Sequence, residues 1–594
     1  MTEETASEPE DPTDAEDTEE DEESDNSSFI KFNAKNGVLK ISGVEDFTMP
    51  EDLDISSIKK IVMSKEVLSA DLTGRGNTYD DLESVKCSDD CQVSIFKDDI
   101  SGSPFYQNSK NWTRGVLYIG STMVSIGKDA PKVCVLKSNL SLIESDATES
   151  LANTAPQIER FEIAESNKDF KTDALGILYS KDQTRIEMFP PASPVETFDL
   201  PDSVKSLQIP ASKNLKVIRI SARSSLEYVD HSDLNNAPIT PLREYIVADG
   251  HPNFYSEDGV LFSKGRDGEQ GETVLLDYPR GRTEKEYTIP DKTERVGYGA
   301  FQDSLYLEKV NIPASVSDLG DMDGFFSAFI GCKKLTRVNV DKGNDNYSST
   351  ADGLLISQDQ RMVYLPGRTS KNFTVPSDIK GFEVYGNEYL ETIELGKNVE
   401  SFSADECPSL RSFSAENNKN GYYTNDGVLY RKMQDWEETK KENTWLVYYP
   451  VGRRDKEFTV PDGVTHLNGA GEWSSDSAFR NNPYIEEIAL PDSVTFIGIG
   501  AFAGCTSLKK VNLPDKLKNL GNGAFHGCTS LKEITIPTSL EALGYYDGID
   551  SYALFGSSIT DIYYKGTKAQ WDKLVKASDY PAILPGGVTV HCAK

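Results

Sequence analysis

Hydrophobic and polar residues alternate in short bursts along this chain, and the bursts return at a fixed interval. From Ala501 to Pro537 the sequence reads AFAGCTSLKKVNLPDKLKNLGNGAFHGCTSLKEITIP, so the pattern A-F-x-G-C-x-x-L-x-x-[VI]-x-[LI]-P occurs twice with a period of 23 residues. Upstream copies read AFQDSLYLEKVNIP from Ala300, AFIGCKKLTRVNV from Ala328 and AFRNNPYIEEIALP from Ala478. A leucine pattern of this kind that repeats about every 20–29 residues is typical of leucine-rich solenoids.

Each copy of the pattern predicts one short β-strand. Val511 and Leu513 alternate with Lys510 and Asn512, as on a strand with one buried face, and Pro514 ends the strand because proline cannot continue the ladder. One such unit cannot bury its apolar face alone, so the units must stack with their strands in parallel. The sequence therefore predicts a repeat solenoid of leucine-rich repeats with 23-residue units, built from short parallel strands, turns and short helical or 3-10 segments.

A second pattern is interleaved with the first. It reads FYSEDGVLF at 254–262, NYSSTADGLLI at 346–356 and GYYTNDGVLY at 421–430, with a degenerate copy from Asp169. Each copy is followed by an aromatic residue and proline, as in LLDYPRGR, VYLPGR and VYYPVGRR. Asp-Gly between two apolar runs is a strong hairpin signal. We therefore expect β-hairpin inserts between the simple repeats.

The ends of the chain differ from the repeats, as capping units must. We predict four parts: an acidic disordered tail at 1–27, an N-terminal capping and degenerate repeat region at 28–150, the solenoid with its inserts at 151–560, and a C-terminal cap at 561–594. The tail holds 14 acidic residues and no lysine or arginine, so it cannot bury enough apolar surface to become ordered. In the C-terminal cap we expect a strand, a short helix around Trp571 and a closing strand at Val588–Val590.

These motifs resemble a known family. GAFAGCTSLKKVNLPDKLKNLG, the D-G-V-L-Y and Y-P-x-G-R inserts and the terminal IYYKGTKAQW are similar to the bacterial cell-surface leucine-rich repeat proteins of the BspA-like family. The resemblance covers residues 150–594 well and 28–150 loosely. It implies an exported protein of a bacterial surface that binds host or neighbouring-cell macromolecules and has no catalytic residues.

Charge narrows the classes of partner. The formal net charge is −34, and without the 14 acidic groups of the tail it is still −20 (−34 + 14). An acidic body argues against nucleic acid, because binding there depends on lysine and arginine neutralising phosphates. The partner expected from the resemblance is an extracellular protein or glycan, and the chain is expected to be a monomer.

The start of the chain leaves two interpretations of its location open. The sequence has no run of 18 apolar residues, so we expect no transmembrane segment, and MTEETASEPEDPTD is acidic where a secretory signal would be basic. The chain is either cytosolic, or a mature form that has lost its export signal together with a lipid or wall anchor. The resemblance favours the second interpretation, an extracellular lipoprotein at the cell surface.

The cysteines raise the question of metal or disulfide chemistry. Four of them stand three residues before the leading leucine of a repeat, where other units hold Asn or Ser: Cys332, Cys407, Cys505 and Cys528 against Asn387, Asn482, Ser304 and Ser212. Zinc sites need close pairs of ligands, which a 23-residue spacing does not supply, so we predict small buried groups that hydrogen-bond the backbone. For the CSDDC pair, Cys87 and Cys91, a local disulfide and two thiols both stay open.

No catalytic motif of the forms G-x-S-x-G, H-E-x-x-H or G-x-x-x-x-G-K-[ST] occurs, so we predict no enzyme, no cofactor and no metal. Binding residues are expected where strand positions face away from the core, on the concave side of the solenoid. These candidates are Lys309, Asn311, Arg337, Asn339, Thr392, Glu394, Glu487, Lys510, Asn512, Glu533 and Thr535. The aromatic residues of the inserts, which are either further binding residues or local core, are Tyr278, Tyr364, Tyr448 and Tyr449.

The function predicted from these features is a non-catalytic, surface-exposed binding scaffold of adhesin-like character. Its ligand would be a host or neighbouring-cell protein or glycan, recognised through the solenoid surface. Two alternatives remain: a structural cell-wall spacer without a specific ligand, and a hydrolase subunit whose site lies within residues 28–150.

Overall fold

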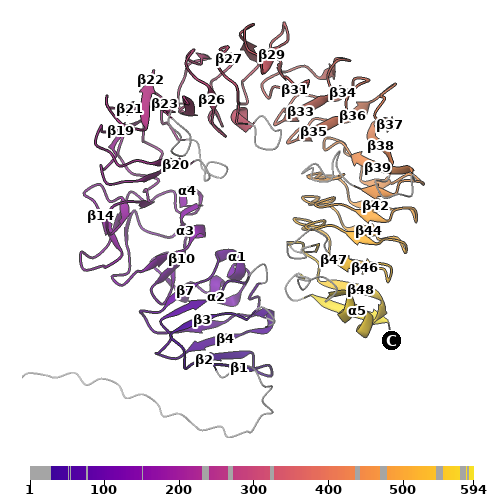
Figure 1. The fold of residues 1–594 in the computed structure, drawn as a ribbon. Coiled ribbons are helices and arrows are strands. Elements are labelled where there is room, and N and C mark those ends of the chain that lie inside the picture. The colour runs from indigo at the N-terminus through magenta and orange to yellow at the C-terminus, as the bar shows by residue number, and fades with distance from the viewer. Residues whose placement is uncertain are drawn as a thin grey trace, which may run out of the picture.

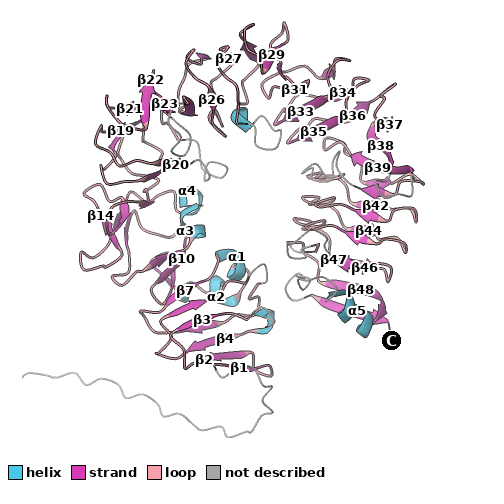
Figure 2. Cartoon of the chain, in the orientation of Figure 1, coloured by secondary structure: helices cyan, strands magenta, loops and turns pink. Residues whose placement is uncertain are grey.

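The computed structural model describes residues 29–50, 53, 55–74, 78–149, 151–230, 240–264, 272–320, 327–434, 442–467, 478–543, 553–554, 556–575, 584 and 588–593. The predicted acidic tail at 1–27 lies outside these residues. Coils of the chain follow one another around an open arc, and both ends of the arc lie at the bottom of the view (Figure 1). Almost all regular structure is β-strand, with a few short helices (Figure 2). The predicted repeat solenoid is confirmed.

Each regular coil contributes one strand to each of two rows. In the first row Glu487 pairs with Lys510, 23 residues later, and the two strands run parallel. The strands of the first row are β2 (Val38–Ile41), β4 (Lys60–Met63), β6 (Ser84–Lys86), β11 (Val133–Val135), β13 (Arg160–Glu162), β17 (Thr197–Asp199), β19 (Val217–Ile220), β21 (Glu244–Val247), β25 (Glu286–Thr288), β27 (Lys309–Ile312), β28 (Arg337–Val340), β32 (Asn372–Thr374), β34 (Thr392–Glu394), β36 (Ser412–Ser414), β40 (Glu457–Thr459), β42 (Glu487–Ala489), β44 (Lys510–Asn512), β46 (Glu533–Ile536), β48 (Asp561–Thr567) and β49 (Thr589–Ala593).

The second row follows the first within each coil, after a turn that begins with proline in coils such as those of β27, β44 and β46. The strands of the second row are β3 (Asp46–Thr48), β5 (Ser69–Asp71), β7 (Gln92–Ser94), β10 (Thr122–Ile126), β12 (Leu142–Ile143), β16 (Ile186–Met188), β18 (Ser206–Gln208), β20 (Tyr228–Asp230), β24 (Val274–Asp277), β26 (Arg295–Val296), β31 (Arg361–Tyr364), β33 (Gly381–Tyr385), β35 (Ser401–Asp405), β39 (Glu442–Tyr448), β41 (His466–Leu467), β43 (Phe496–Ile497), β45 (Asn519–Leu520) and β47 (Ala542–Leu543). Both rows begin in the segment 28–150, where the sequence repeat is weak, since β2, β4 and β6 already pair in parallel. The four-part division of the chain itself stays a prediction.

The predicted β-hairpins are present. In each insert two antiparallel strands follow a strand of the first row, and a third strand then joins the second row. The hairpin strands are β14 (Phe170–Thr172) with β15 (Leu178–Ser180), β22 (Phe254–Glu257) with β23 (Val260–Ser263), β29 (Tyr347–Ser349) with β30 (Leu355–Ser357), and β37 (Tyr422–Asn425) with β38 (Val428–Gln434). At the β22–β23 turn Asp258 and Gly259 have φ of 49° and 74°, as a two-residue hairpin turn requires.

Two further hairpins were not predicted. One joins β8 (Trp112–Thr113) to β9 (Val116–Ile119) and continues into β10, and the other joins β1 (Ile30–Asn33) to β2. The first turns at Arg114 and Gly115, with φ of 50° and 78°. This is the same turn geometry as at Asp258 and Gly259, with an arginine in place of the aspartate.

The α-helices lie in the first third of the chain and near its C-terminal end. They are α1 (Lys97–Ile100), α2 (Pro104–Gln107), α3 (Ser145–Glu149), α4 (Leu151–Thr154) and α5 (Lys568–Val575), with 3-10 turns η1 (Ile55–Ser57), η2 (Ser109–Asn111) and η4 (Ser327–Phe329). Helix α5 contains Trp571, which is buried, and β49 closes the chain by pairing with β48. The helix around Trp571 lies where the sequence predicts it, and the closing strand overlaps the predicted Val588–Val590 but extends to Ala593.

The core fills the space between the two rows. The repeat's apolar positions are buried, among them Leu508, Val511, Leu517 and Leu520. The phenylalanines of the A-F motif stack from coil to coil, since the ring centroids of Phe502 and Phe525 lie 5.1 Å apart at an interplanar angle of 9°. Because each coil buries its apolar residues against its neighbours, the stability of a coil depends on the coils stacked next to it.

Candidate functional site

The predicted binding residues lie on strands of the first row and alternate with buried residues. In β44 the burial pattern is exposed, buried, exposed for Lys510, Val511 and Asn512. The same alternation holds at Lys309 and Asn311 in β27 and at Glu533 and Thr535 in β46. We call this outward side of the first row the strand face. In Figure 1 the first-row strands β19, β27 and β34 lie farther from the centre of the arc than the second-row strands β20, β26 and β33, so the strand face lies on the convex side and not on the concave side expected from the sequence. That it binds a partner stays a prediction.

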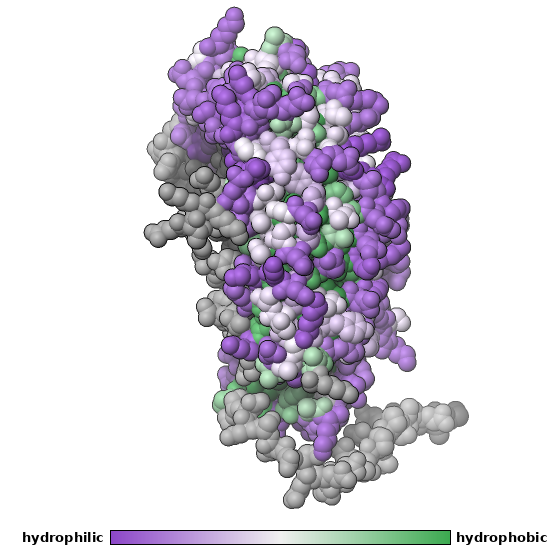
Figure 3. All heavy atoms as spheres, turned by 90° about the vertical axis from the view of Figure 1, so that its right-hand side faces the viewer, coloured by the Kyte–Doolittle hydropathy of each residue, from purple (hydrophilic) through white to green (hydrophobic). Residues whose placement is uncertain are grey.

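Parallel pairing gathers these residues into blocks rather than one continuous surface. The hairpin inserts separate the sheets β25-β27-β28, β32-β34-β36 and β40-β42-β44 of the first row. The sheet β46-β48-β49 is also separate, although only the second-row strand β45 lies between β44 and β46. Figure 3 shows the side of the molecule that lies to the right in Figure 1, where hydrophilic residues flank a paler central strip with some exposed hydrophobic residues. The surface of this half of the chain is therefore mixed in polarity.

The block on β25, β27 and β28 carries a connected polar network. Asn339 donates through Nδ2 to Oδ1 of Asn311 at 2.8 Å, and Asn311 donates to Oε1 of Glu286 at 2.8 Å. The ammonium of Lys309 lies 2.7 Å from the same carboxylate, and Arg337 donates through Nε to Asn339 at 2.8 Å. These side chains hold one another in place, so a ligand would meet a largely preorganised surface.

The blocks nearer the C-terminus use charge pairs and single contacts. Lys510 pairs with Glu487 of the preceding coil, and this contact raises the pKa of Lys510. Asn512 donates to the carbonyl of Leu490 at 3.0 Å and accepts from its N–H at 2.9 Å. Thr392 donates to Asn372 at 2.6 Å. Glu394 accepts from Thr374 at 2.9 Å in the same block.

The cysteines of the repeat are buried and contact the backbone. Sγ of Cys505 donates to the carbonyl of Phe479 at 3.0 Å, and Sγ of Cys528 donates to that of Phe502 at 3.2 Å. Both thiols thus point to the coil before their own. Burial raises the pKa of Cys528 to about 12, so the thiol stays protonated at neutral pH.

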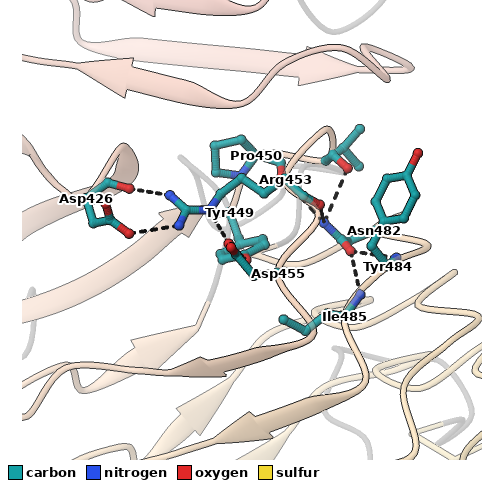
Figure 4. Close-up of polar contacts among 9 residues, drawn as sticks. Asp426, Tyr449, Pro450, Arg453, Asp455, Asn482, Tyr484 and Ile485 are labelled. Atoms are coloured by element: carbon teal, nitrogen blue, oxygen red, sulfur yellow. Dashed lines mark hydrogen bonds and ion pairs between the residues drawn. The ribbon is translucent and has the colours of Figure 1, made fainter.

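Asparagine in the same slot makes more bonds than cysteine. Asn482 is fully buried, donates to the carbonyls of Val451 and Arg453 at 3.3 and 3.4 Å, and accepts from the N–H groups of Tyr484 and Ile485 at 3.0 Å each (Figure 4). One carboxamide therefore satisfies backbone groups on two successive coils. The interpretation of this slot as a structural turn position is supported for cysteine and asparagine alike.

In three of the four hairpin inserts, the two halves are joined by an arginine that was not predicted. Arg453 of the Y-P-V-G-R-R segment donates to the main-chain carbonyl and, at 2.8 Å, to the carboxylate of Asp426 in the Asp-Gly turn (Figure 4). Its Nε also donates to Asp455 at 2.6 Å. Arg282 with Asp258, and Arg368 with Asp352, repeat this arrangement, which we call the arginine clamp.

The aromatic residues of the inserts belong to the core. Tyr278, Tyr364, Tyr448 and Tyr449 are all buried, with exposures of 6% or less. The guanidinium of Arg453 lies over the ring of Tyr449, 5.4 Å from its centroid. Arg282 and Arg368 lie over the rings of Tyr278 and Tyr364 in the same way. All four tyrosines thus pack in the local core, and Tyr448 in addition lines a cavity.

The remaining chemistry of the described residues is sparse. Within the ranges given above, no group of three or more His, Cys, Asp or Glu side chains is arranged to hold a metal ion. Over those same ranges, no helix has the length and apolar character that crossing a membrane requires. Cys87 and Cys91 are both thiols in the structure, and a hydrogen bond between them together with burial raises the pKa of Cys87.

A cavity lined by Ala404, Asp405, Glu406 and Arg480 was missed by sequence reasoning. The signal was available, because aligning the repeats on Cys407 and Cys505 puts Ala404 where the regular coil has Phe502. None of the strand-face candidates lines this cavity, but Tyr448, named from the sequence among the aromatic residues of the inserts, does.

The coils stack with their parallel strands in two rows, and the repeated leucines and turn cysteines are buried between them. This arrangement defines a leucine-rich repeat solenoid. The family model described as "BspA type Leucine rich repeat region" matches residues 282–351 and 474–567, in six copies. These segments are leucine-rich repeats of the BspA type, and the resemblance stated from the sequence is confirmed there.

Three solved structures illustrate what the chain is similar to. A leucine rich cell surface protein from Faecalibacterium prausnitzii is 20% identical over 55% of this chain and 98% of its own, with a TM-score of 0.30. A leucine-rich repeat protein from Eubacterium ventriosum is 16% identical over 90% and 94%, with a TM-score of 0.22. The pneumococcal vaccine antigen PcpA is 14% identical over 96% and 98%, with a TM-score of 0.27. No curated protein matches the chain.

Proposed function

We propose that this chain is a non-catalytic binding scaffold displayed at a bacterial surface, and that it recognises an extracellular protein or glycan through the strand face. The observation that carries this proposal is the polar network of the β25-β27-β28 block. Lys309, Asn311, Arg337 and Asn339 present donors and acceptors at spacings set by the strands beneath them. A rigid polar surface loses little side-chain entropy when a partner binds.

The family type agrees with this proposal. The BspA-type repeats matched in residues 282–351 include the whole of β27 and β28, so the proposed surface is built by the repeats themselves. The resemblance to bacterial cell-surface proteins supports the proposed location. Protease treatment of intact cells of the source bacterium tests the location, since a displayed chain is cut while a cytosolic protein is spared.

Binding is tested by screening the full chain on a glycan array and on a panel of extracellular matrix and bacterial surface proteins. The proposal expects at least one partner that binds reproducibly. A chain that is displayed but binds nothing on either array favours the cell-wall spacer. Turnover of an arrayed glycan or protein would contradict the non-catalytic part of the proposal and favour the hydrolase.

A matched pair of lysines tests whether the strand face is the binding surface. Lys510 lies on the strand face, and Lys518 precedes the second-row strand β45 of the same coil. Both side chains are exposed, at 69% and 60%, and each pairs with a glutamate one coil away, Glu487 or Glu541. A partner that binds this part of the strand face should be lost with Lys510→Glu and kept with Lys518→Glu.

The first block has its own pair of substitutions, because a partner can bind one block and not another. Asn311→Ala combined with Asn339→Ala removes the centre of the polar network while leaving the buried Val310 and Val338 in place. A partner whose binding is unchanged by both this double substitution and Lys510→Glu does not bind these two blocks. The proposal as stated would then be wrong for them.

A further inference from the structure

A cavity of about 250 Å³ lies where the regular stacking of coils is interrupted by the insert β37-β38-β39. On one side of the cavity is the end of β35 and the turn after it, and on the other is the A-F turn that begins at Ala478. The residues that line it are Ala404, Asp405, Glu406, Cys407, Pro408, Tyr448, Val451, Arg480 and Asn481. All of them belong to the described residues.

The cavity exists because one position of the repeat has lost its ring. In regular coils this position holds a phenylalanine that stacks on the next, as Phe479 does on Phe502 at 5.5 Å between ring centroids. We call it the ring position. From Leu365 through Val384 to Ala404 the residue at the ring position becomes smaller with each coil. All three are buried, so the side-chain volume that a phenylalanine would fill is missing at Ala404.

The cavity has an apolar floor and a polar rim. Ala404, Tyr448 and Val451 form the floor and are 2%, 6% and 8% exposed. Tyr448 is fixed by edge-on contacts with the rings of Phe402 and Phe413 at 5.9 and 5.4 Å between centroids. The floor is therefore a rigid surface that includes an aromatic ring.

The rim carries both charges. Asp405 and Glu406 stand on one side, and Arg480 and Asn481 on the other. Glu406 and Asn481 have φ of 49° and 60°, at the turn position that Gly504 occupies with φ of 74° in the regular coil. A glutamate rarely adopts this left-handed conformation, and such departures concentrate at functional sites.

The mixture of groups narrows the ligand class. The two carboxylates on the rim would repel an anion, and the guanidinium of Arg480 offsets much of the attraction that they would exert on a cation. A hydroxyl both donates and accepts hydrogen bonds, and thus fits carboxylates, a guanidinium and a carboxamide together. A ligand with several hydroxyls and one apolar face would satisfy the rim and the floor at once.

We propose that this cavity binds a single neutral sugar ring, with its C–H face on Tyr448 and Val451 and its hydroxyls on Asp405, Glu406 and Arg480. The volume is below the roughly 300–1,000 Å³ of sites for drug-sized molecules, which suits one ring and excludes a longer oligosaccharide inside the cavity. For a ligand of this size the dissociation constant should be on the order of 1 mM. The site is separate from the strand face and does not depend on the proposed function.

The test uses the full chain and a defined panel of probes. Methyl glycosides of neutral hexoses and N-acetylhexosamines represent the proposed class, putrescine represents cations, and glucuronic acid represents anions. Saturation-transfer NMR detects binding in the millimolar range, and titration gives the dissociation constants. We expect at least one neutral glycoside to bind, and putrescine and glucuronic acid to bind at least about 10-fold more weakly.

Substitutions locate the binding. Ala404→Phe restores the ring of the regular repeat, fills the cavity and should weaken binding by at least about 10-fold. Ala351→Phe adds the same ring on an exposed turn of another insert and should leave binding unchanged. Asp405→Asn with Glu406→Gln removes the charged acceptors at the rim and should weaken binding by about 10-fold or more, even if Ala404→Phe fails to fold.

Several results would overturn this proposal. It is wrong if no neutral glycoside binds, if only putrescine or only glucuronic acid binds, or if binding persists in both the folded Ala404→Phe and the Asp405→Asn/Glu406→Gln chains. The test of the cavity and the test of the strand face can be told apart by their substitutions. Lys510→Glu and the Asn311/Asn339 substitutions should not affect the neutral glycoside, and Ala404→Phe should not affect a partner of the strand face.

Discussion

Replacing Asn387 by alanine should destabilise the solenoid much more than replacing Cys505 by alanine, although both residues occupy the same slot of the repeat. The carboxamide of Asn387 is fully buried and donates to the carbonyls of Leu365, Pro366 and Arg368 at 3.3, 3.0 and 2.8 Å. It also accepts from two backbone N–H groups that follow it, at 3.0 and 2.8 Å. Its removal leaves these buried groups without their partner.

The size of the effect follows from the bonds that are lost. Each buried N–H left unsatisfied costs about 1–3 kcal/mol, so Asn387→Ala should cost about 3 kcal/mol even if water reaches some of the carbonyls. Cys505 makes one thiol contact, to the carbonyl of Phe479 at 3.0 Å, and its truncation also removes a little packing. Cys505→Ala should therefore cost about 1 kcal/mol.

The assay is guanidinium unfolding followed by far-UV circular dichroism, combined with native-state hydrogen exchange of the coil that carries each substitution. Exchange is needed because a long solenoid does not unfold in a single two-state step. Asn387→Ser is the matched control and should fall between the two, since serine occupies the same slot at Ser304. Equal or larger destabilisation by Cys505→Ala would refute this reasoning and would indicate that the thiol has a role beyond filling the turn.

Three further predictions concern the clamp and the thiols. Arg368→Met removes the clamp on Asp352 and should lower the local stability of the β29–β30 hairpin by about 2 kcal/mol, with Arg368→Lys intermediate, as measured by hydrogen exchange; no change would contradict the clamp. The hydroxyl of Thr350 first, and the guanidinium of Arg368 after it, lower the pKa of Asp352. The contribution of this carboxylate is thus present above its unfolded pKa of about 4 and lost as pH falls through the lower folded pKa. The difference in unfolding midpoint between the native chain and Asp352→Asn should hold above about pH 5 and shrink below about pH 3; a difference that grows in acid would contradict the sign. Burial raises the pKa of Cys332 and Cys528 to about 12, so at pH 8 both should resist alkylation until the chain unfolds, and rapid labelling in the native chain would show that they are accessible.

The sequence predicted those parts of the fold that depend on local spacing. The alternation of Lys510, Val511 and Asn512 shows which side of the strand is buried, because side chains on a strand alternate with a period of two. The shared slot of Cys505 and Asn482 predicted a structural role, because two residue types with different metal chemistry would not replace each other at a zinc site.

What the sequence did not reveal depends on contacts between distant residues or on an unusual turn. Arg453 reaches Asp426 across 27 residues, and only the folded insert shows that the two motifs meet. The hairpin at Arg114 was missed because arginine rarely adopts a positive φ, whereas aspartate before glycine is a familiar turn. The cavity at Ala404 needed a comparison of residue size at one repeat position across several coils.

The central claim is that a partner binds the strand face and not the second row. Lysine acetylation of the chain, with and without a partner found in the binding screen, tests this claim most directly. The claim predicts that the partner protects Lys309, Lys510 or both from acetylation, while Lys518 on the same coil as Lys510 reacts as in the chain alone. Protection of Lys518 with neither Lys309 nor Lys510 affected would contradict it, because the partner would then lie on the second row and not on the strand face.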